Sequence, residues 1–131
     1  MGSSHQRPRV VVIVEDDSDL RDSIGVLLAT SGVPSRQYDS AETFLADPRA
    51  FDDLGCLLVD QYFPGMSGVD LLRRLSADGR LPPAILFSAC LTERIALEAR
   101  MAGALAVLDK PVGPVALLTQ LSNALSFAAA S

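Results

Sequence analysis

Five short hydrophobic runs are spaced along the chain, and segments with helical periodicity lie between them. The runs cover residues 10–14, 35–38, 56–59, 84–87 and 106–108. Four of them are continuous in apolar residues, which is typical of strands buried on both faces of a parallel sheet. The run at 35–38 alternates between polar and apolar residues, so it suits an edge strand.

Apolar residues at helical spacing follow the first two runs. The first helix is expected to end at Gly32, because glycine suits the left-handed conformation at a helix C-terminus. The second helix is expected to be short, since Ser40 can cap its start and Pro48 ends it. The apolar positions that carry these two helices are Leu20, Ile24, Leu27, Leu28, Phe44 and Leu45.

Three more helices complete the pattern. One runs to Gly79, the next opens at Thr92 and ends before Gly103, and the last follows Pro114. The apolar positions of the first two of these are Val69, Leu71, Leu72, Leu75, Ile95, Leu97 and Met101. Strand and helix therefore alternate, which predicts an α/β fold: one doubly wound parallel sheet with right-handed crossovers and helices on both faces.

Composition narrows the class of protein. The 131 residues, 49% hydrophobic and 21% charged, predict a single folded domain. The 16 Asp and Glu against 11 Lys and Arg give a net charge of −5, and nonspecific binding to nucleic acid needs clustered basic side chains, so we expect no direct contact with nucleic acid. No run is long enough to span a membrane and no signal peptide is evident, so a cytoplasmic location is expected.

The chain ends and the cysteines carry simple expectations. Residues 1–8, whose opening Met-Gly-Ser-Ser-His resembles a vector-derived leader, are expected to be a disordered leader or a tag remnant. The folded domain is expected over 9–128, with a tail at 129–131. Cys56 and Cys90 lie in or just after buried runs, so both are expected to be small core thiols rather than parts of a disulfide framework.

Polar residues gather where the predicted strands end, which is the edge where ligands bind in open α/β sheets. They are Glu15, Asp16 and Asp17 after the first run, Asp60 after the third, Ser88 after the fourth, and Asp109 and Lys110 after the fifth. A hard divalent cation would relieve the repulsion between the acids, and Mg²⁺ fits best because it prefers oxygen ligands. Ser88 could donate a hydrogen bond and Lys110 a charge to phosphoryl oxygens, which favours phosphoryl chemistry.

Simpler roles for these residues remain open. Acids at the start of a helix often only cap it or interact with its dipole, and Ser88 could make a local hydrogen bond. A purely structural Asp60 is harder to accept, because a carboxylate after a buried strand is costly without a partner. Lys110 is the only lysine among 11 basic residues, which suggests that a compact ammonium is needed there.

Four short motifs occur in order at the ends of the predicted strands. They are Val-Glu-Asp-Asp at 14–17, Val-Asp-Gln-Tyr-Phe-Pro-Gly-Met-Ser-Gly at 59–68, Phe-Ser-Ala at 87–89, and Gly-Ala followed by Asp-Lys-Pro between 103 and 111. With these motifs, residues 9–128 resemble the receiver domain of bacterial two-component response regulators (CheY-like superfamily). The resemblance implies a flavodoxin-like (βα)5 fold whose five-stranded sheet has the order 2-1-3-4-5.

The resemblance also implies how phosphoryl transfer would work. Asp60 would be the phosphoacceptor, and Ser88 and Lys110 would each contact an oxygen of the phosphoryl group. Pro111 would follow a cis peptide bond. The chain would then be a signalling phosphoacceptor rather than an enzyme, since it would catalyse only its own phosphorylation and dephosphorylation.

A magnesium site is implied by the same resemblance. Asp16, Asp60 and the backbone carbonyl of Tyr62 would ligate Mg²⁺, and Glu15 would act largely through a metal-bound water. No other cofactor is expected.

Two features depart from the family pattern. Residue 107, three before Lys110, is Val, whereas active receivers usually carry Tyr or Phe there to turn inward as Ser88 moves, so this switch is expected to be weakened. Tyr62 and Cys90 lie two residues after Asp60 and Ser88, at positions that modulate access of the hydrolytic water in the family. The simpler alternatives are that Val107 only fills space and that the ring of Tyr62 lies in solvent.

The expected partners are a sensor histidine kinase or phosphotransfer protein, and a downstream protein or fused effector domain. No contact with a membrane is expected, and a weak homodimer is left open.

Two other functions compete with this one. A hydrolase with an aspartyl-phosphate intermediate usually has a second acid two residues after its nucleophile, where this chain has Tyr62. A degenerate receiver would bind partners without phosphorylation, but its site would not need an intact Asp60, Ser88 and Lys110.

Overall fold

Five strands and five helices alternate along the part of the chain that the computed structural model describes, residues 9–130. The strands are β1 (Val10–Val14), β2 (Ser35–Tyr38), β3 (Leu54–Asp60), β4 (Ala84–Ser88) and β5 (Ala106–Asp109). The helices are α1 (Ser18–Thr30), α2 (Ala41–Ala46), α3 (Gly68–Ala77), α4 (Glu93–Met101) and α5 (Pro114–Ala130). The leader predicted over residues 1–8 lies outside the described residues.

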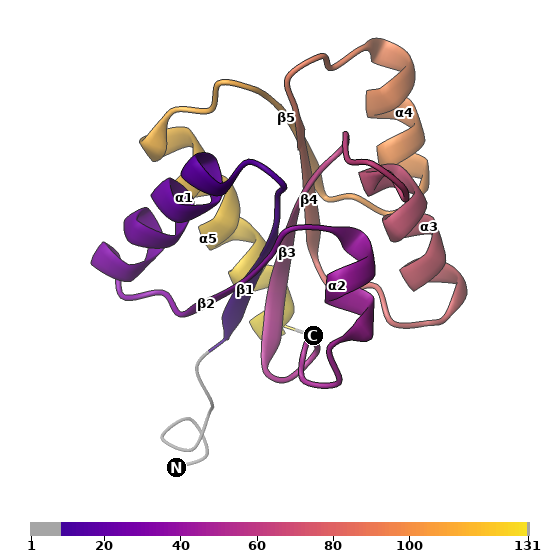
Figure 1. Ribbon diagram of the computed structural model, residues 1–131. Coiled ribbons are helices and arrows are strands. Elements are labelled where there is room, and N and C mark those ends of the chain that lie inside the picture. The colour runs from indigo at the N-terminus through magenta and orange to yellow at the C-terminus, as the bar shows by residue number, and fades with distance from the viewer. Residues whose placement is uncertain (1–8, 131) are drawn as a thin grey trace.

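The strands form one parallel sheet in the order β2-β1-β3-β4-β5. This confirms the doubly wound α/β fold and the flavodoxin-like strand order that the resemblance implied. The run at 35–38 is an edge strand, as its alternating pattern predicts. Because all strands are parallel, their carboxyl ends lie at one edge of the sheet (Figure 1). The polar residues that follow the strands are therefore brought together at this edge.

Helices cover both faces of the sheet (Figure 1). α1 and α5 pack on one face against alternate strand residues, among them Ile13, Leu58 and Phe87. α2, α3 and α4 pack on the other face, against residues such as Val14 and Leu86. The central strands are therefore buried on both sides, which explains why their sequences are mostly apolar up to the polar residues Asp60 and Ser88 at the ends of β3 and β4.

The residues that the sequence predicts at the starts and ends of helices are found there in the structure. Ser40 caps α2 in a reciprocal capping box with Thr43, and α2 ends before Pro48. Thr92 caps α4, since its side chain accepts the Ile95 N–H. Gly32, after α1, has a φ of 76°, the left-handed conformation that glycine adopts without strain.

Several sequence predictions need correction. β5 is only half-buried, because it is the second edge strand and has a neighbour on one side alone. Leu97 and Met101 are exposed, whereas Ile95 packs on the core, because residues two apart lie on opposite sides of a helix. α5 continues through Ala130, consistent with the high helix propensity of alanine, and the last residue of the predicted tail, Ser131, lies outside the described residues.

Within residues 9–130, no helix has both the length and the hydropathy that a membrane-spanning segment requires.

Candidate functional site

Three acids from the ends of the two central strands meet at the carboxyl edge of the sheet. Glu15 directly follows β1, Asp16 comes next, and Asp60 is the last residue of β3. One carboxylate oxygen of each lies within 4.8 Å of the others. Glu15 and Asp60 are buried, with 1% and 5% of their surface exposed, while Asp16 is open to solvent. This set of oxygen donors, accessible from one side, fits a hard divalent cation that keeps some of its waters.

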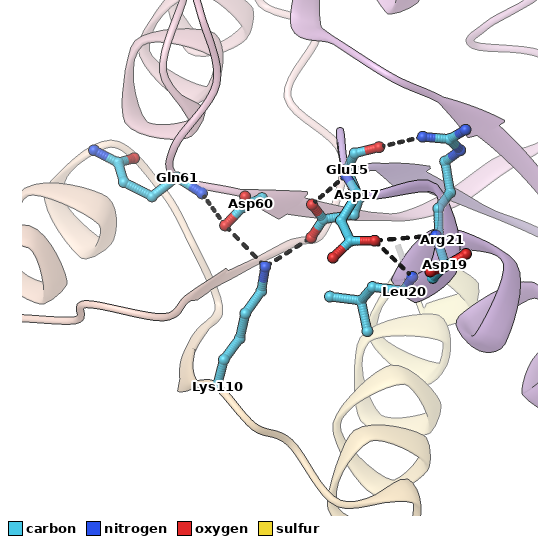
Figure 2. A network of polar contacts seen from close by, with 8 residues as sticks. All are labelled: Glu15, Asp17, Asp19, Leu20, Arg21, Asp60, Gln61 and Lys110. Atoms are coloured by element: carbon cyan, nitrogen blue, oxygen red, sulfur yellow. Dashed lines mark hydrogen bonds and ion pairs between the residues drawn. The ribbon is translucent and has the colours of Figure 1, made fainter.

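Lys110 lies between the two buried acids. Its Nζ is 2.7 Å from Oε1 of Glu15 and 3.3 Å from Oδ1 of Asp60 (Figure 2). The ammonium also lies 4.5 Å from the centre of the Phe87 ring, a cation–π distance. The Lys110–Pro111 peptide bond is cis, as the resemblance implied. The only lysine of the chain is therefore held beside Asp60 as a partly buried point charge.

Burial shifts the protonation of these groups. It raises the pKa of the Glu15 carboxyl above 4.5 and that of the Asp60 carboxyl above 3.8, although Lys110 acts against both shifts. Burial also lowers the pKa of Lys110, but the hydrogen bond to Glu15 and the charge of Asp60 outweigh it, so the net shift is upward. The ammonium therefore stays charged, and the two carboxylates lack full compensation.

Ser88 ends β4 and contributes an unpaired hydroxyl. The residue is fully buried, and its Oγ has no hydrogen-bond partner among the described residues. The alternative that Ser88 makes a local hydrogen bond is therefore not supported. A buried hydroxyl without a partner is unfavourable, and the Ser88 Oγ is free to donate a hydrogen bond to a ligand at the end of β4.

Of the three acids at positions 15–17, only Asp17 acts mainly as a helix cap. Asp17 is the N-cap of α1, because its carboxylate accepts the N–H groups of Asp19 and Leu20. Glu15 accepts the N–H of Asp17 at 3.0 Å, but its other oxygen contacts Lys110 (Figure 2). Glu15 therefore contributes to both the turn and the acidic cluster.

Tyr62 and Cys90 lie on the two loops that follow β3 and β4. The Tyr62 side chain is 47% exposed, and its hydroxyl donates to the backbone carbonyl of Cys90 at 3.4 Å. Cys90 is exposed, so its predicted place in the core is wrong; it lies two residues beyond the end of β4, in the loop. Cys56 is a buried core thiol, as predicted, and burial raises its pKa to about 12.

Val107 lies in the half-buried strand β5, opposite Leu86 of β4. Its side chain packs on the core cluster beneath α3 and α4, which includes Ala99 and Ala102. The structure thus places the residue next to the helix that follows Ser88.

Two residues that the sequence analysis did not select also hold the site. Arg21 of α1 donates from Nη1 to the backbone carbonyl of Glu15 at 2.7 Å, which fixes the junction between β1 and α1. Gln61 donates its backbone N–H to Oδ1 of Asp60 at 2.9 Å (Figure 2). Arg21 lies among the acidic residues of the 15–22 segment, and Gln61 directly follows the predicted phosphoacceptor.

Comparison with known proteins gives a consistent result. The chain matches the family model of the response regulator receiver domain over residues 11–122. It is 38% identical over 104 residues to the C4-dicarboxylate transport transcriptional regulatory protein DctR of Rhodobacter capsulatus, covering 77% of this chain and 52% of DctR. It is 34% identical over 115 residues to the transcriptional regulatory protein FixJ of Azorhizobium caulinodans, covering 88% of this chain and 54% of FixJ.

A solved structure supports the same assignment. The crystal structure of FixJ-N matches with a TM-score of 0.81 and 31% identity, covering 92% of this chain and 96% of that one. The chain spans about half the length of the curated relatives it matches. Because the family model extends from β1 into α5, the chain belongs to the receiver domains of two-component response regulators.

Proposed function

We propose that the chain is the phosphoacceptor module of a two-component phosphorelay and that Asp60 receives the phosphoryl group. The observation that supports this function best is the position of Asp60, with the Lys110 ammonium 3.3 Å away and the unpaired Ser88 hydroxyl at the end of the adjacent strand. The relatives are named as transcriptional regulatory proteins, which fits a signalling role rather than metabolic catalysis.

The magnesium ion would be held by Asp16, Asp60 and the backbone carbonyl of Tyr62, with Glu15 acting through water. The clustered carboxylates fit this ion, since their oxygens lie within 4.8 Å and two of them are poorly compensated. When bound, Mg²⁺ supplies positive charge that neutralises the acids and the phosphoryl oxygens.

In the transfer step, a carboxylate oxygen of Asp60 forms a bond to phosphorus while the bond from phosphorus to the donor breaks. With a kinase as donor, the leaving group is the imidazole of its phosphohistidine, which takes up a proton. Lys110 holds one phosphoryl oxygen by charge, and the Ser88 hydroxyl donates to another, which satisfies its open hydrogen bond.

Dephosphorylation would occur by attack of water on the phosphorus of the aspartyl phosphate, which releases inorganic phosphate and restores the Asp60 carboxylate. Tyr62 and Cys90 lie on the loops that follow Asp60 and Ser88, and the Tyr62 hydroxyl joins these two loops. We therefore assign these two residues the role of limiting the hydrolytic water. They do not carry the transfer step itself.

The partners follow from this role. A sensor histidine kinase or phosphotransfer protein supplies the phosphoryl group in the cytoplasm, and a downstream protein or a fused effector domain receives the signal. The fused arrangement is favoured by the curated relatives, which are about twice as long as the matched segment. The chain itself is not an enzyme that acts on other molecules, and the hydrolase alternative lacks its usual second acid, because Tyr62 stands there.

Labelling by a small phosphodonor tests the proposal. Incubation with acetyl phosphate and Mg²⁺ should add one phosphoryl group, detected by intact-mass spectrometry, and EDTA should prevent it. Asp60→Asn should abolish labelling, whereas Asp17→Asn should label normally, because Asp17 caps α1 and asparagine caps equally well. A folded wild-type protein that takes up no phosphoryl group would support the degenerate receiver instead.

A further inference from the structure

Gln61, the residue after the proposed phosphoacceptor, makes three hydrogen bonds that the proposed function does not use. Its backbone N–H donates to Oδ1 of Asp60 at 2.9 Å, and its backbone carbonyl accepts the N–H of Gly68 at 3.1 Å. Its side-chain oxygen Oε1 accepts the N–H of Val69 at 2.9 Å. One residue thus connects the Asp60 carboxylate with the first turn of α3.

These bonds satisfy amides that a helix cannot satisfy by itself. The first N–H groups of a helix lack acceptors within it and need partners from outside. In α3, Gln61 accepts two of them, from Gly68 and Val69, and the N-cap Ser67 accepts that of Asp70. Because the Val69 N–H is a donor, it also fixes the orientation of the Gln61 amide, with the oxygen toward the helix.

The start of α3 lies directly against the end of β3. A Cβ atom added to Gly68 would be 2.2 Å from the backbone oxygen of Asp60, so only glycine permits this approach. Together with the bonds of Gln61, this contact closes the loop of residues 61–67 on itself. The loop contains Tyr62, whose carbonyl is the proposed third ligand of the magnesium ion.

We propose that Gln61 is a positioning residue that clamps this loop, holding the Asp60 carboxylate and the Tyr62 carbonyl in place for the metal. The inference rests on the proposed function and goes beyond it, since it assigns a role to a residue that neither ligates the metal nor contacts the phosphoryl group. The clamp acts through hydrogen bonds alone: the side chain ties the loop to α3, and the backbone N–H orients Asp60.

Gln61→Met tests the clamp, because methionine has a similar length but no amide oxygen to accept from Val69. We expect the Val69 amide to lose its protection from hydrogen exchange in the metal-free protein, as measured by NMR. We also expect Mg²⁺ to bind about tenfold more weakly in a titration followed by tyrosine fluorescence, the scale found when a group that orients metal ligands is removed. Gln61→Glu should restore the protection of Val69, because a carboxylate oxygen can accept the same bond.

Ser67→Ala is the matched control. It removes a side-chain acceptor from the same helix turn, that of Asp70, but Ser67 makes no bond to Asp60 or Gln61 in the described structure. Its Mg²⁺ affinity should stay close to that of the wild type. Equal losses of Mg²⁺ affinity in Gln61→Met and Ser67→Ala would overturn the proposal, since the effect would then come from the helix end alone.

A measurement on the wild-type protein gives an independent check. Addition of Mg²⁺ should slow exchange of the Gly68 and Val69 amides further, because a ligated Tyr62 carbonyl holds the closed loop. Unchanged exchange at both amides on saturation with Mg²⁺ would overturn the clamp. None of these readouts needs phosphorylation, so failure of the wild type to take up a phosphoryl group would count against the proposed function and not against the clamp.

Discussion

The side chains of Glu15 and Asp60 carry the main electrostatic cost of the site. Both carboxyls are buried, and burial outweighs the attraction of Lys110, so the pKa of each lies above its usual value. A protein does not gain stability from such groups in the absence of a ligand. Together with Asp16, these two carboxyls form an acidic cluster that could hold a metal ion.

Asp60→Asn should raise the free energy of unfolding of the metal-free protein at pH 7. The folded state disfavours the ionised form of Asp60, because its pKa is raised above 3.8, so ionisation costs stability as the pH rises through that pKa. The gain from the substitution should shrink as the pH falls through the raised pKa and should vanish below pH 3.8, where Asp60 is neutral in both states. Urea unfolding in EDTA over a pH series measures this, and a variant less stable than wild type at pH 7 would contradict it.

Asp16→Asn should weaken Mg²⁺ binding more than Glu15→Gln. The first substitution removes a proposed direct ligand, while the second removes a group proposed to act through water and expected to cost about tenfold. Titration by tyrosine fluorescence is feasible because the chain has 2 Tyr and no Trp, and Tyr62 lies beside the site. Equal affinities for both variants and the wild type would refute the proposed ligand set.

At the scale of elements, the hydrophobic pattern predicted the strands and helices well. Strands that are buried on both faces appear in the sequence as continuous apolar runs. β1 and β2 have the predicted bounds, whereas β3 begins earlier than expected, at Leu54, since Gly55 interrupts its apolar run. The order of the strands came from the resemblance alone, because hydrophobic pattern cannot rank neighbours in a sheet. The exposure of Leu97 was missed, since apolar residues on a short helix do not reveal which side packs.

The site likewise contains some residues that the sequence pattern can identify and others whose roles appear only in the folded structure. Asp60, Ser88 and Lys110 could be selected because the polar residues at the ends of parallel strands gather at one edge of the sheet, and because a buried carboxylate such as Asp60 is costly without a partner. Gln61 and Arg21 could not, because a glutamine in a loop and an arginine on a helix are common at the surface. Their roles depend on contacts that exist only after folding, such as the bond from Gln61 to Val69 of α3.

Gly68→Ala should destabilise the protein by about 1–3 kcal/mol, the usual range for overpacking. The new methyl group would lie 2.2 Å from the Asp60 carbonyl oxygen and 2.7 Å from Leu86, so the start of α3 must shift. Gly79→Ala is a useful control, since its Cβ has open space and only the left-handed backbone opposes it. Denaturant unfolding measures both, and an unchanged midpoint for Gly68→Ala would show that α3 moves at no cost.

With Val at position 107, phosphorylation should change the surface formed by α4, β5 and α5 less than it does in receivers that carry Tyr or Phe there. Beryllofluoride, which mimics a phosphoryl group, should draw in Ser88 and protect amides at residues 89–92 and the start of α4. Changes in β5 and α5 should stay small, because Val107 has no ring to turn inward. Hydrogen exchange of the free and beryllofluoride-bound protein measures this, and strong new protection across 106–110 and α5 would show full coupling without the ring.

For the whole molecule, the site exists only when the sheet is complete. Glu15 and Lys110 are 95 positions apart in the chain and 2.7 Å apart in the fold. Glu15 and Asp16 follow β1, Asp60 and Ser88 end β3 and β4, and Lys110 directly follows β5, so no isolated segment could assemble the site. Ligand binding to such a site stabilises the entire fold, since the unfolded chain has no comparable arrangement.

Asp60 itself should carry the phosphoryl group, and mapping the modified residue is the sharpest test of this assignment. After reaction with acetyl phosphate and Mg²⁺, borohydride reduces an aspartyl phosphate to homoserine, which tandem mass spectrometry locates in the sequence. We expect homoserine at position 60 and at no other acid, with none formed in EDTA. The assignment would be contradicted by reduction of Asp16 or Glu15 in place of Asp60. It would also be contradicted by a phosphoryl group on Ser88 with Asp60 unmodified.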